Sequence, residues 1–373
     1  MTLRVAFLVD SPSKRAHGNA ASRLALGLVQ TGRAEVELVS YSDDPAPPWL
    51  PDEVAVHRLE ADRASRLVPG LATYLRSHAP DVLITRQVHA NFAGLASAGA
   101  ARLRGGWGGH LVLVQDHLVQ LAHRSNKLDN KWVARLTYRF ADGVIAPSPT
   151  VRDNVVRWCS LDAASTALVP NPIPGFGGPV GPPPHRWLVD GGPPVFINVS
   201  NMLWFKRVDL LIDAFAEVRR HHDTKLLVLG EGPERAAADE RIRALGLTQS
   251  AETVGWIDDP LQFATRAWAL VHPSDEDGFA QVLTEAMSTG CPVVAADSLG
   301  GGPRFVTDSG AFGMLVPRGD RPALVEAMEQ MLDPALRSHY STLGLARAAE
   351  MSPTASANAL MAFLEALERR RKD

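Results

Sequence analysis

Two carboxylates are spaced so that they could bind one phosphorylated ligand. Asp277 lies in the loop-like run SDEDG, and Glu285 stands in the helical run AQVLTEAMSTG that follows. Gly278 permits a sharp entry into this helix, whose first N–H groups and positive end form an anion site. Glu285 lies about 8 Å along the axis, so the two carboxylates could hold hydroxyls on either side of bound phosphates. An amphipathic helix with Glu285 in solvent is an equally good interpretation.

Lys206 and Gly18 each stand between an apolar run and a helical run. Lys206 precedes the amphipathic stretch VDLLIDAFAEV, where a lysine can neutralise a diphosphate. Gly18 follows RVAFLVD, and a glycine at such a turn lets the backbone approach a phosphate. The dinucleotide fingerprint G-x-G-x-x-G is absent there, which argues against a dehydrogenase. A solvated lysine and an ordinary turn glycine beside Asn19 are the simpler alternatives.

Short apolar runs alternate with helical runs along both halves of the chain, which is typical of parallel sheets covered on both faces. A Pro- and Gly-rich stretch, 170–194, interrupts the alternation and predicts a linker. We therefore predict an α/β protein with two doubly wound domains, 1–178 and 179–352. A helical segment, 353–373, follows, and packing back on the N-terminal domain is one arrangement for it. Ligands of such folds bind at the carboxyl ends of the strands, so we expect a cleft between the two domains.

The composition is that of a soluble globular protein, with 46% hydrophobic residues, 21% charged residues and a net charge of −3. Cys159 and Cys291 are far apart and have no metal-ligand spacing, which favours a reducing compartment. The first residues do not resemble a signal peptide, and no apolar run is long enough to span a bilayer. We expect a cytoplasmic protein.

The first half of the chain carries a basic stretch. Between Arg63 and Arg157 there are 13 basic and 5 acidic residues, concentrated in HRSNKLDNKWVARLTYRF (123–140). In a helix the basic residues fall at every fourth position beside apolar ones: Lys131, Arg135 and Arg139 next to Trp132, Val133, Leu136 and Phe140. Two interpretations stay open, a helix at a membrane surface and a helix with its apolar stripe in the domain core.

These segments together resemble bacterial members of glycosyltransferase family 4, within the GT-B fold. The family carries an acidic residue, seven others and Glu inside a run like EGFxxxLLEAMAxGxPVVA. This chain has Asp277, seven residues, Glu285 and the continuation EAMSTGCPVVAAD. The runs FKRVDLLIDAFAEV, LGEGPER and DSLGGGPRFVTDSGAFGMLVPRGD are also similar, so the match spans most of residues 195–335. LVLVQDHLV and PSPTVRDNVV…LVPNPI carry a weaker similarity in the first half.

The resemblance implies a role for each matching position. Glu285 would bind the ribose hydroxyls, Lys206 the diphosphate, and His117 would line the sugar site near the reacting carbon. Gly18 would face the phosphates from the other domain, and backbone near Ile257 would hold the base. The donor sugar would be held by Asp277 and by the backbone of Gly278, Phe279, Ala280 and Gln281.

Two positions depart from the family pattern. Asp277 stands where the family usually has Glu, which shortens the carboxylate by one methylene. Asn201 stands where it usually has Arg, so another basic residue or the helix N-terminus must supply the missing phosphate cation.

The resemblance implies a retaining transferase that moves a hexosyl or N-acetylhexosaminyl group from a nucleotide-diphosphate sugar, with UDP favoured. The acceptor is a sugar, a lipid-linked sugar or a small molecule, with no nucleic acid, metal ion or cofactor involved. The main task is stabilising the leaving diphosphate. Replacing Glu285 or Lys206 by Ala is expected to remove activity and leave the fold intact. A nucleotide-sugar 2-epimerase and a non-catalytic nucleotide-sugar-binding protein are the alternatives.

Overall fold

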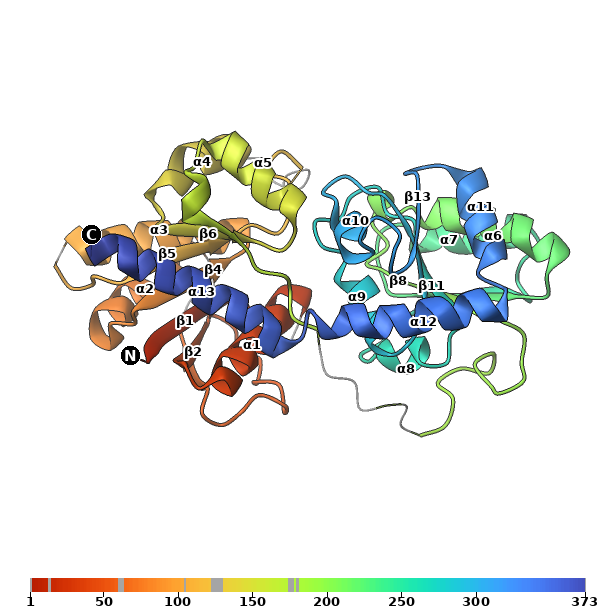
Figure 1. Ribbon diagram of the computed structural model, residues 1–373, viewed down its shortest axis with the longest axis horizontal. Helices are drawn as coiled ribbons and strands as arrows, with labels where there is room; N and C mark the ends of the chain where they lie inside the picture. The colour runs from red at the N-terminus through yellow and green to blue at the C-terminus, as the bar shows by residue number, and fades with distance from the viewer. Residues whose placement is uncertain are drawn as a thin grey trace. The chain divides into compact units, whose positions relative to one another are not determined.

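In the computed structural model the chain forms two compact units, each built around its own parallel β-sheet (Figure 1). Unit 1 consists of Met1–Pro172 and Met351–Asp373, and unit 2 of Ile173–Glu350. These boundaries lie a few residues before the predicted ones at 178/179 and 352/353. The structure describes residues 2–12, 15–59, 64–103, 105–121, 130–173, 178 and 181–372. The prediction of two doubly wound α/β domains is confirmed.

The sheet of unit 1 has seven parallel strands in the order β3-β2-β1-β4-β5-β6-β7. The order reverses between β1 and β4, which pair with each other, so their carboxyl ends mark the switch point of this sheet. The strands are β1 (Leu3–Val9), β2 (Ala34–Ser40), β3 (Ala55–Arg58), β4 (Val82–Arg86), β5 (His110–Val114), β6 (Gly143–Ala146) and β7 (Thr166–Leu168).

Helices cover both faces of this sheet, because alternate strand residues point to opposite sides. Val5 and Phe7 pack with α1 and α13 on one face, whereas Ala6 and Leu8 pack with α2 and α3 on the other. A Cβ on Gly27 would lie 2.0 Å from the Pro353 carbonyl oxygen, so this glycine lets α1 and α13 pack closely. The helices are α1 (Arg15–Thr31), α2 (Ala64–His78), α3 (Val88–Leu103), α4 (Asn130–Thr137), η1 (Tyr138–Phe140), α5 (Pro149–Cys159), η2 (Ala163–Ser165) and α13 (Pro353–Lys372).

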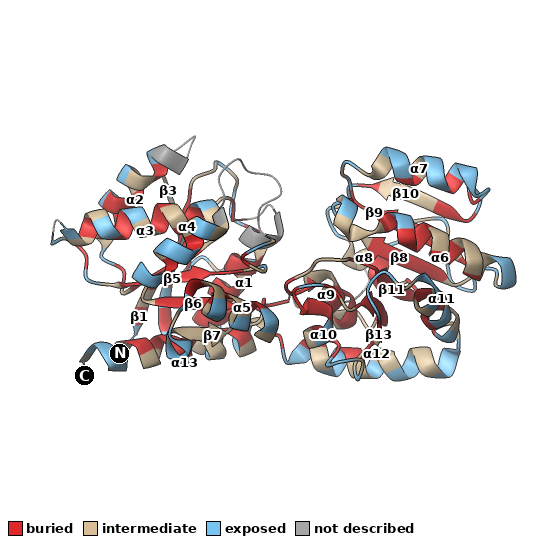
Figure 2. Ribbon diagram, turned by 90° about the horizontal axis from the view of Figure 1, so that it is seen from above, coloured by how far each residue is buried: buried red, intermediate tan, exposed pale blue. Residues whose placement is uncertain are grey.

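The sheet of unit 2 has six parallel strands in the order β10-β9-β8-β11-β12-β13, and its order reverses between β8 and β11. The strands are β8 (Val195–Val199), β9 (Lys225–Leu229), β10 (Ala251–Gly255), β11 (Ala269–His272), β12 (Val293–Ala296) and β13 (Met314–Val316). The residues of β8, β9, β11 and β12 are almost all buried, as Figure 2 shows for β8 and β11. This burial explains the near-continuous apolar runs in the sequence.

Helices α6, α7 and α11 pack on one face of the second sheet through a shared apolar core. The helices of unit 2 are η3 (Trp204–Lys206), α6 (Val208–His221), α7 (Arg235–Ala244), α8 (Leu261–Ala264), α9 (Gln281–Ser288), α10 (Gly302–Val306), α11 (Arg321–Gln330) and α12 (Pro334–Ala349). The described residues between β7 and β8 form no helix or strand, in line with the predicted linker, of which 174–177, 179 and 180 lie outside the described residues.

Candidate functional site

The strand order of unit 2 brings two of the predicted residues together. Lys206 ends η3, which follows β8, and Asp277 lies in the loop after β11. Since β8 and β11 are neighbours at the switch point of the sheet, both side chains emerge at the edge where such folds bind ligands. The topology therefore brings Lys206 and Asp277, which the sequence analysis singled out separately, to the same edge of the sheet.

Lys206 and Asp277 form a largely buried ion pair. Lys206 Nζ lies 2.8 Å from Asp277 Oδ2, and the two side chains are only 16% and 13% exposed. The other carboxylate oxygen, Oδ1, accepts the backbone N–H groups of Phe279 at 3.2 Å and Ala280 at 2.5 Å. Burial alone would raise the pKa of Asp277, but the charge of Lys206 and the hydrogen bond from His272 hold that pKa well below its usual range. Asp277 is therefore ionised at neutral pH.

His272 completes this cluster, and sequence reasoning missed it. It ends β11, is 1% exposed, and places Nε2 3.2 Å from Asp277 Oδ2. Burial lowers the pKa of His272, and the nearby charge of Lys206 lowers it further. The imidazole is therefore neutral, and because the ionised carboxylate can only accept, Nε2 must carry the proton and donate it. The available signal was a polar residue inside the buried strand ALVHPS.

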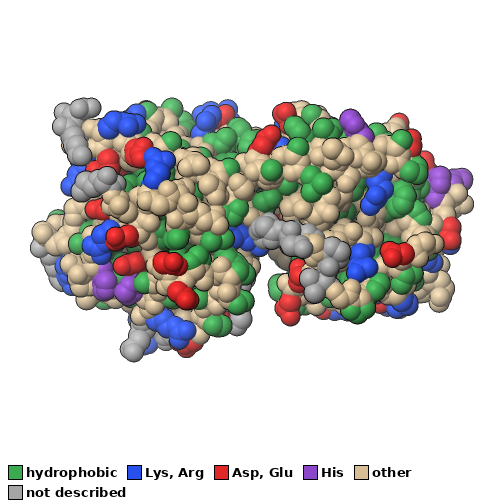
Figure 3. All heavy atoms as spheres, turned by 60° about the horizontal axis from the view of Figure 1, so that its bottom comes forward, with side chains coloured by type: hydrophobic (Ala, Val, Ile, Leu, Met, Phe, Trp, Pro, Cys, Tyr) green, Lys and Arg blue, Asp and Glu red, His purple; other side chains and the backbone are tan. Residues whose placement is uncertain are grey.

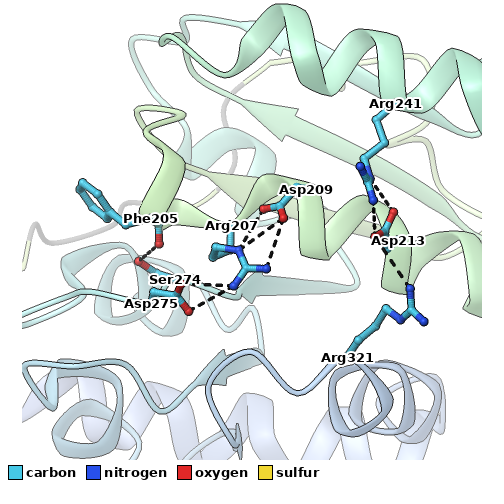
Figure 4. Close-up of polar contacts among 8 residues, drawn as sticks. All are labelled: Phe205, Arg207, Asp209, Asp213, Arg241, Ser274, Asp275 and Arg321. Carbon is cyan, nitrogen blue, oxygen red and sulfur yellow. Dashed lines mark hydrogen bonds and ion pairs between the residues drawn. The ribbon is translucent and has the colours of Figure 1, made fainter.

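Backbone hydrogen bonds hold the loop that carries Asp277 in place. The Asp275 N–H donates to the Phe205 carbonyl at 2.7 Å, and the Gly302 N–H donates to the Asp277 carbonyl at 3.1 Å. Ser274 Oγ donates to the same Phe205 carbonyl, as Figure 4 shows. A Cβ on Gly300, which has a φ of 98°, would lie 2.6 Å from the Asp277 carbonyl oxygen. A glycine is therefore required at position 300, because the backbone of the run SLGGGP approaches the Asp277 loop too closely for a side chain.

Arg207 is the basic residue next to Lys206, but carboxylates already hold it. Its guanidinium lies 3.1 Å from Asp209 and 3.2 Å from Asp275, so it bridges α6 and the 274–277 loop (Figure 4). Its backbone is left-handed, with a φ of 52°. Asn201 is exposed in the loop after β8, and its carbonyl lies so close to Gly232 that a Cβ there would clash at 2.0 Å. The charge of Arg207 is therefore already balanced by Asp209 and Asp275. Arg207 does not replace the phosphate-binding Arg that the family usually has where this chain has Asn201.

Glu285 lies in α9, which begins at Gln281 after Ala280 adopts a left-handed φ of 58°. Gln281 Nε2 donates to Glu285 Oε1 at 2.9 Å. Leu283, Ala286 and Met287 are buried, as the amphipathic pattern predicts, and Glu285 is half-buried. The N–H groups of Phe279 and Ala280, which were expected to hold the donor sugar, are engaged by Asp277 itself.

The remaining predicted residues lie at other strand ends. Ile257 is half-buried in the loop after β10. In unit 1, His117 is exposed in the loop after β5, and its carbonyl accepts Gln115 Nε2 at 2.6 Å. Gly18 lies within the first turn of α1, which begins at Arg15, so it does not stand at a turn ahead of the helix as the sequence predicted.

The loop with His117 is anchored by a buried arginine that sequence reasoning did not single out. Arg86, at the end of β4, binds both carboxylate oxygens of Asp116, through Nε at 3.0 Å and through Nη2. The same Nη2 donates to Asn171 Oδ1 at 2.9 Å. Both side chains of the ion pair are only 9% exposed, and Arg86 ties the ends of β4 and β5 to the crossover segment after β7.

The described residues contain neither a helix that could span a membrane nor a cluster that could hold a metal ion. None of the helices in the described ranges is long and apolar enough to cross a bilayer. The same residues contain no cluster of three or more His, Cys, Asp or Glu side chains arranged to hold a metal ion.

Comparisons with known proteins match both units. The family model described as Glycosyl transferases group 1 matches residues 184–342, and the model described as Glycosyl transferase 4-like domain matches residues 16–172. An exopolysaccharide phosphotransferase of Streptomyces coelicolor is 28% identical over 319 residues, 80% of this chain and 29% of its own length. A lipopolysaccharide 1,6-galactosyltransferase of Salmonella typhimurium is 27% identical over 263 residues, 69% of this chain and 67% of its own length. The chain spans less than two thirds of the length of the first curated relatives that it matches.

Solved structures share the fold over the whole chain. The Anabaena protein HepE, solved in complex with UDP and glucose, has a TM-score of 0.79 at 20% identity, covering 97% of this chain and 99% of that one. A sucrose-phosphate synthase of Thermosynechococcus elongatus has a TM-score of 0.79 at 21% identity, covering 99% and 100%. At this level of identity the likeness establishes the fold and nothing beyond it.

Proposed function

The chain belongs to the glycosyltransferases of the family 4 type with the GT-B fold, and from this premise we propose that it is a retaining glycosyltransferase. It transfers a hexosyl or N-acetylhexosaminyl group from a UDP-sugar to a sugar, a lipid-linked sugar or a small molecule. The observation that carries the proposal is the buried Lys206–Asp277 pair at the switch point of unit 2.

The chemistry of Lys206 suits a leaving diphosphate. An ammonium has three N–H donors, and the contact with Asp277 uses one of them. The others can bind the β-phosphate while Asp277 keeps the ammonium in position. Charge that develops on the diphosphate as the sugar–phosphate bond breaks is then met by a preorganised cation.

Asp277 is poorly suited to attack the sugar. Its carboxylate already accepts hydrogen bonds from Lys206, His272 and two backbone N–H groups. A carboxylate that already accepts four hydrogen bonds positions its neighbours, and it is a weak nucleophile. This supports front-side attack by the acceptor, in which the departing phosphate takes the acceptor proton and the anomeric configuration is retained.

The preference for UDP rests on relatives. The Anabaena structure contains UDP and glucose, and the Salmonella relative is named a galactosyltransferase. Other relatives are named for lipid-linked acceptors, including a diphospho-undecaprenol and a phosphatidyl-myo-inositol, and one is named for L-malate. A lipid-linked acceptor, with peripheral membrane contact through unit 1, is therefore our first choice, and a small soluble acceptor is the second.

A turnover assay tests the proposal and separates it from its alternatives. The protein is incubated with UDP-, GDP- and ADP-sugars, with and without a bacterial lipid extract, and nucleotide and sugar products are identified. A transferase releases the nucleoside diphosphate and glycosylates a component of the extract. A 2-epimerase converts the sugar without acceptor, and a binding protein consumes none of the donors.

A further inference from the structure

Three large apolar side chains of α4 and η1 lie in solvent. Trp132, Leu136 and Phe140 are 50%, 59% and 63% exposed. They are spaced four residues apart, so they line one face of the helical segment. Its opposite face is buried through Ala134 and Tyr138. The alternative in which this apolar stripe packs into the domain core is therefore wrong for these three side chains.

An apolar pocket adjoins this stripe. It has a volume of about 550 Å³, and most of its lining residues come from α3 and α4. These two helices contact each other and are neighbours in Figure 2. Phe92, Leu95 and Gly99 line it from α3, and Val133 and Phe140 line it from α4 and η1. Phe140 belongs to both the pocket and the exposed stripe, so the two form one continuous apolar surface.

The same segment is strongly basic. Residues 130–140 contain Lys131, Arg135 and Arg139 and no acidic residue. Arg135 donates to a neutral group, the Trp158 carbonyl at 3.0 Å, and the Arg139 guanidinium lies over the Phe140 ring at 5.1 Å. No carboxylate among the described residues pairs with either arginine. By contrast, acidic and basic side chains are interspersed over the face seen in Figure 3.

The acidic groups packed nearest to the pocket do not cancel this charge. Asp142, just after η1, is bound by Arg102 of α3, which also lines the pocket. Burial would raise the pKa of Asp142, but the nearby His110 and hydrogen bonds from the Leu111 N–H and Arg102 lower it to about 2. This pair is neutral as a whole at neutral pH, so the charge of the surface is set by α4 and η1.

We propose that the surface formed by α4, η1 and the α3–α4 pocket docks on an anionic phospholipid bilayer. Trp132, Leu136 and Phe140 enter the headgroup–acyl boundary, the basic residues face lipid phosphates, and the pocket takes one lipid chain. An interfacial helix needs this combination of apolar and basic faces. The inference rests on the proposed function in one respect, since it supplies the surface for the peripheral membrane contact stated there.

Charge complementarity favours a bilayer over other occupants. A second copy of the chain would place two basic α4 segments against each other, and like charges at an interface cost affinity. Each basic residue near an anionic bilayer strengthens binding roughly fivefold, which is about 1 kcal/mol. Salt weakens this contribution, because the Debye length is about 10 Å at 0.1 M ionic strength.

Co-sedimentation of the full chain with vesicles tests the proposal. We expect binding to phosphatidylglycerol vesicles at low salt, at least tenfold weaker binding at high salt, and little binding to phosphatidylcholine vesicles. Replacing Trp132, Leu136 and Phe140 together by Ser should weaken binding at least tenfold. A matched control replaces Leu245 and Leu345 of unit 2 by Ser, since these are 45% and 47% exposed, and should bind like the wild type.

A second readout locates the contact. Vesicles with brominated acyl chains quench tryptophans that reach the acyl region, so the wild type should be quenched more than W132F. If wild type fails to bind at low salt, or the Ser variant binds as wild type does, the proposal is overturned. A dimer in solution that the Ser variant abolishes, without vesicle binding, would also overturn it. The E285A variant should lose transfer but bind vesicles normally. A wild-type protein that binds vesicles but transfers no sugar would contradict the proposed function and leave the membrane contact intact.

Discussion

Replacing Lys206 by Ala should weaken the fold of unit 2 as well as its activity. The sequence alone suggested that this change would leave the fold intact, but the structure places Lys206 Nζ 2.8 Å from a carboxylate that is 13% exposed. At an effective dielectric constant of about 20, two charges at this distance attract by roughly 6 kcal/mol before the cost of removing them from water. The ion pair is therefore part of the structure of the loop.

The expected loss follows from what remains around Asp277. Removing one partner of a buried pair typically costs about 3–5 kcal/mol. His272 and the N–H groups of Phe279 and Ala280 stay in place, so we expect the low end, about 3 kcal/mol. In a unit of this size each kcal/mol lowers the melting temperature by roughly 2–4 °C, which gives roughly 6–12 °C. Differential scanning calorimetry at pH 7 measures this shift.

The stability difference between K206A and the wild type should depend on pH. The folded-state pKa of Asp277 is depressed, so its stabilisation is present above the unfolded pKa, about 3.9, and is lost as pH falls through the folded value. Without Lys206 that depression shrinks, so the difference between K206A and wild type should be largest near pH 7 and decrease below about pH 4.

A double-mutant cycle with Asp277→Asn isolates the pair, because Asn keeps an oxygen for the two N–H groups. We expect the double variant to be less destabilised than the sum of the single ones by about 2–3 kcal/mol. A K206A protein that melts with the wild type at pH 7, or purely additive variants, would refute this reasoning.

Three further outcomes are expected. E285A should melt normally yet lose transfer about a hundredfold or more, and retention of more than about half its activity would remove Glu285 from the site. H272Q should keep a hydrogen bond to Asp277 but remove the imidazole that titrates. Burial depresses the folded-state pKa of His272, so the stability of the wild type should fall as pH drops below about 6.5. Urea unfolding from pH 7 to 5 should show a smaller loss of stability for H272Q. Transfer should persist in excess EDTA, because in the Asp275-Glu276-Asp277 run the two aspartates face Arg207 and Lys206, and loss of activity that Mg²⁺ or Mn²⁺ restores would contradict this.

Much of the fold could be predicted from the sequence because both sheets are parallel and buried. Runs such as KLLVLGE and PVVAAD are apolar on both faces, which only a covered parallel strand explains. The two helices after β13, α11 and α12, were not predicted individually; α12 buries only Gly344 and Ala348, so its amphipathic pattern is weak. Short edge strands such as β7, with three half-buried residues, give no periodic signal.

The sequence singled out Lys206 and Asp277 but not the contact between them. Lys206 and Asp277 follow different strands, and only the strand order shows that they are neighbours. The sequence shows His272 and Arg86 as polar residues at the ends of apolar runs, but it does not show that they contact Asp277 and Asp116. The exposure of Trp132, Leu136 and Phe140 also depends on which face of α4 the domain covers, and both faces fit the same sequence pattern.

The central claim is that this chain transfers a sugar from a nucleotide-diphosphate donor with retention. Proton NMR of a reaction with UDP-sugars and a bacterial lipid extract tests it most directly, because the anomeric signals of donor and product are resolved in one spectrum. We expect UDP release coupled to a glycosylated product with the anomeric configuration of the donor. An inverted product, a 2-epimer formed without acceptor, or donors that all remain unconsumed would contradict it.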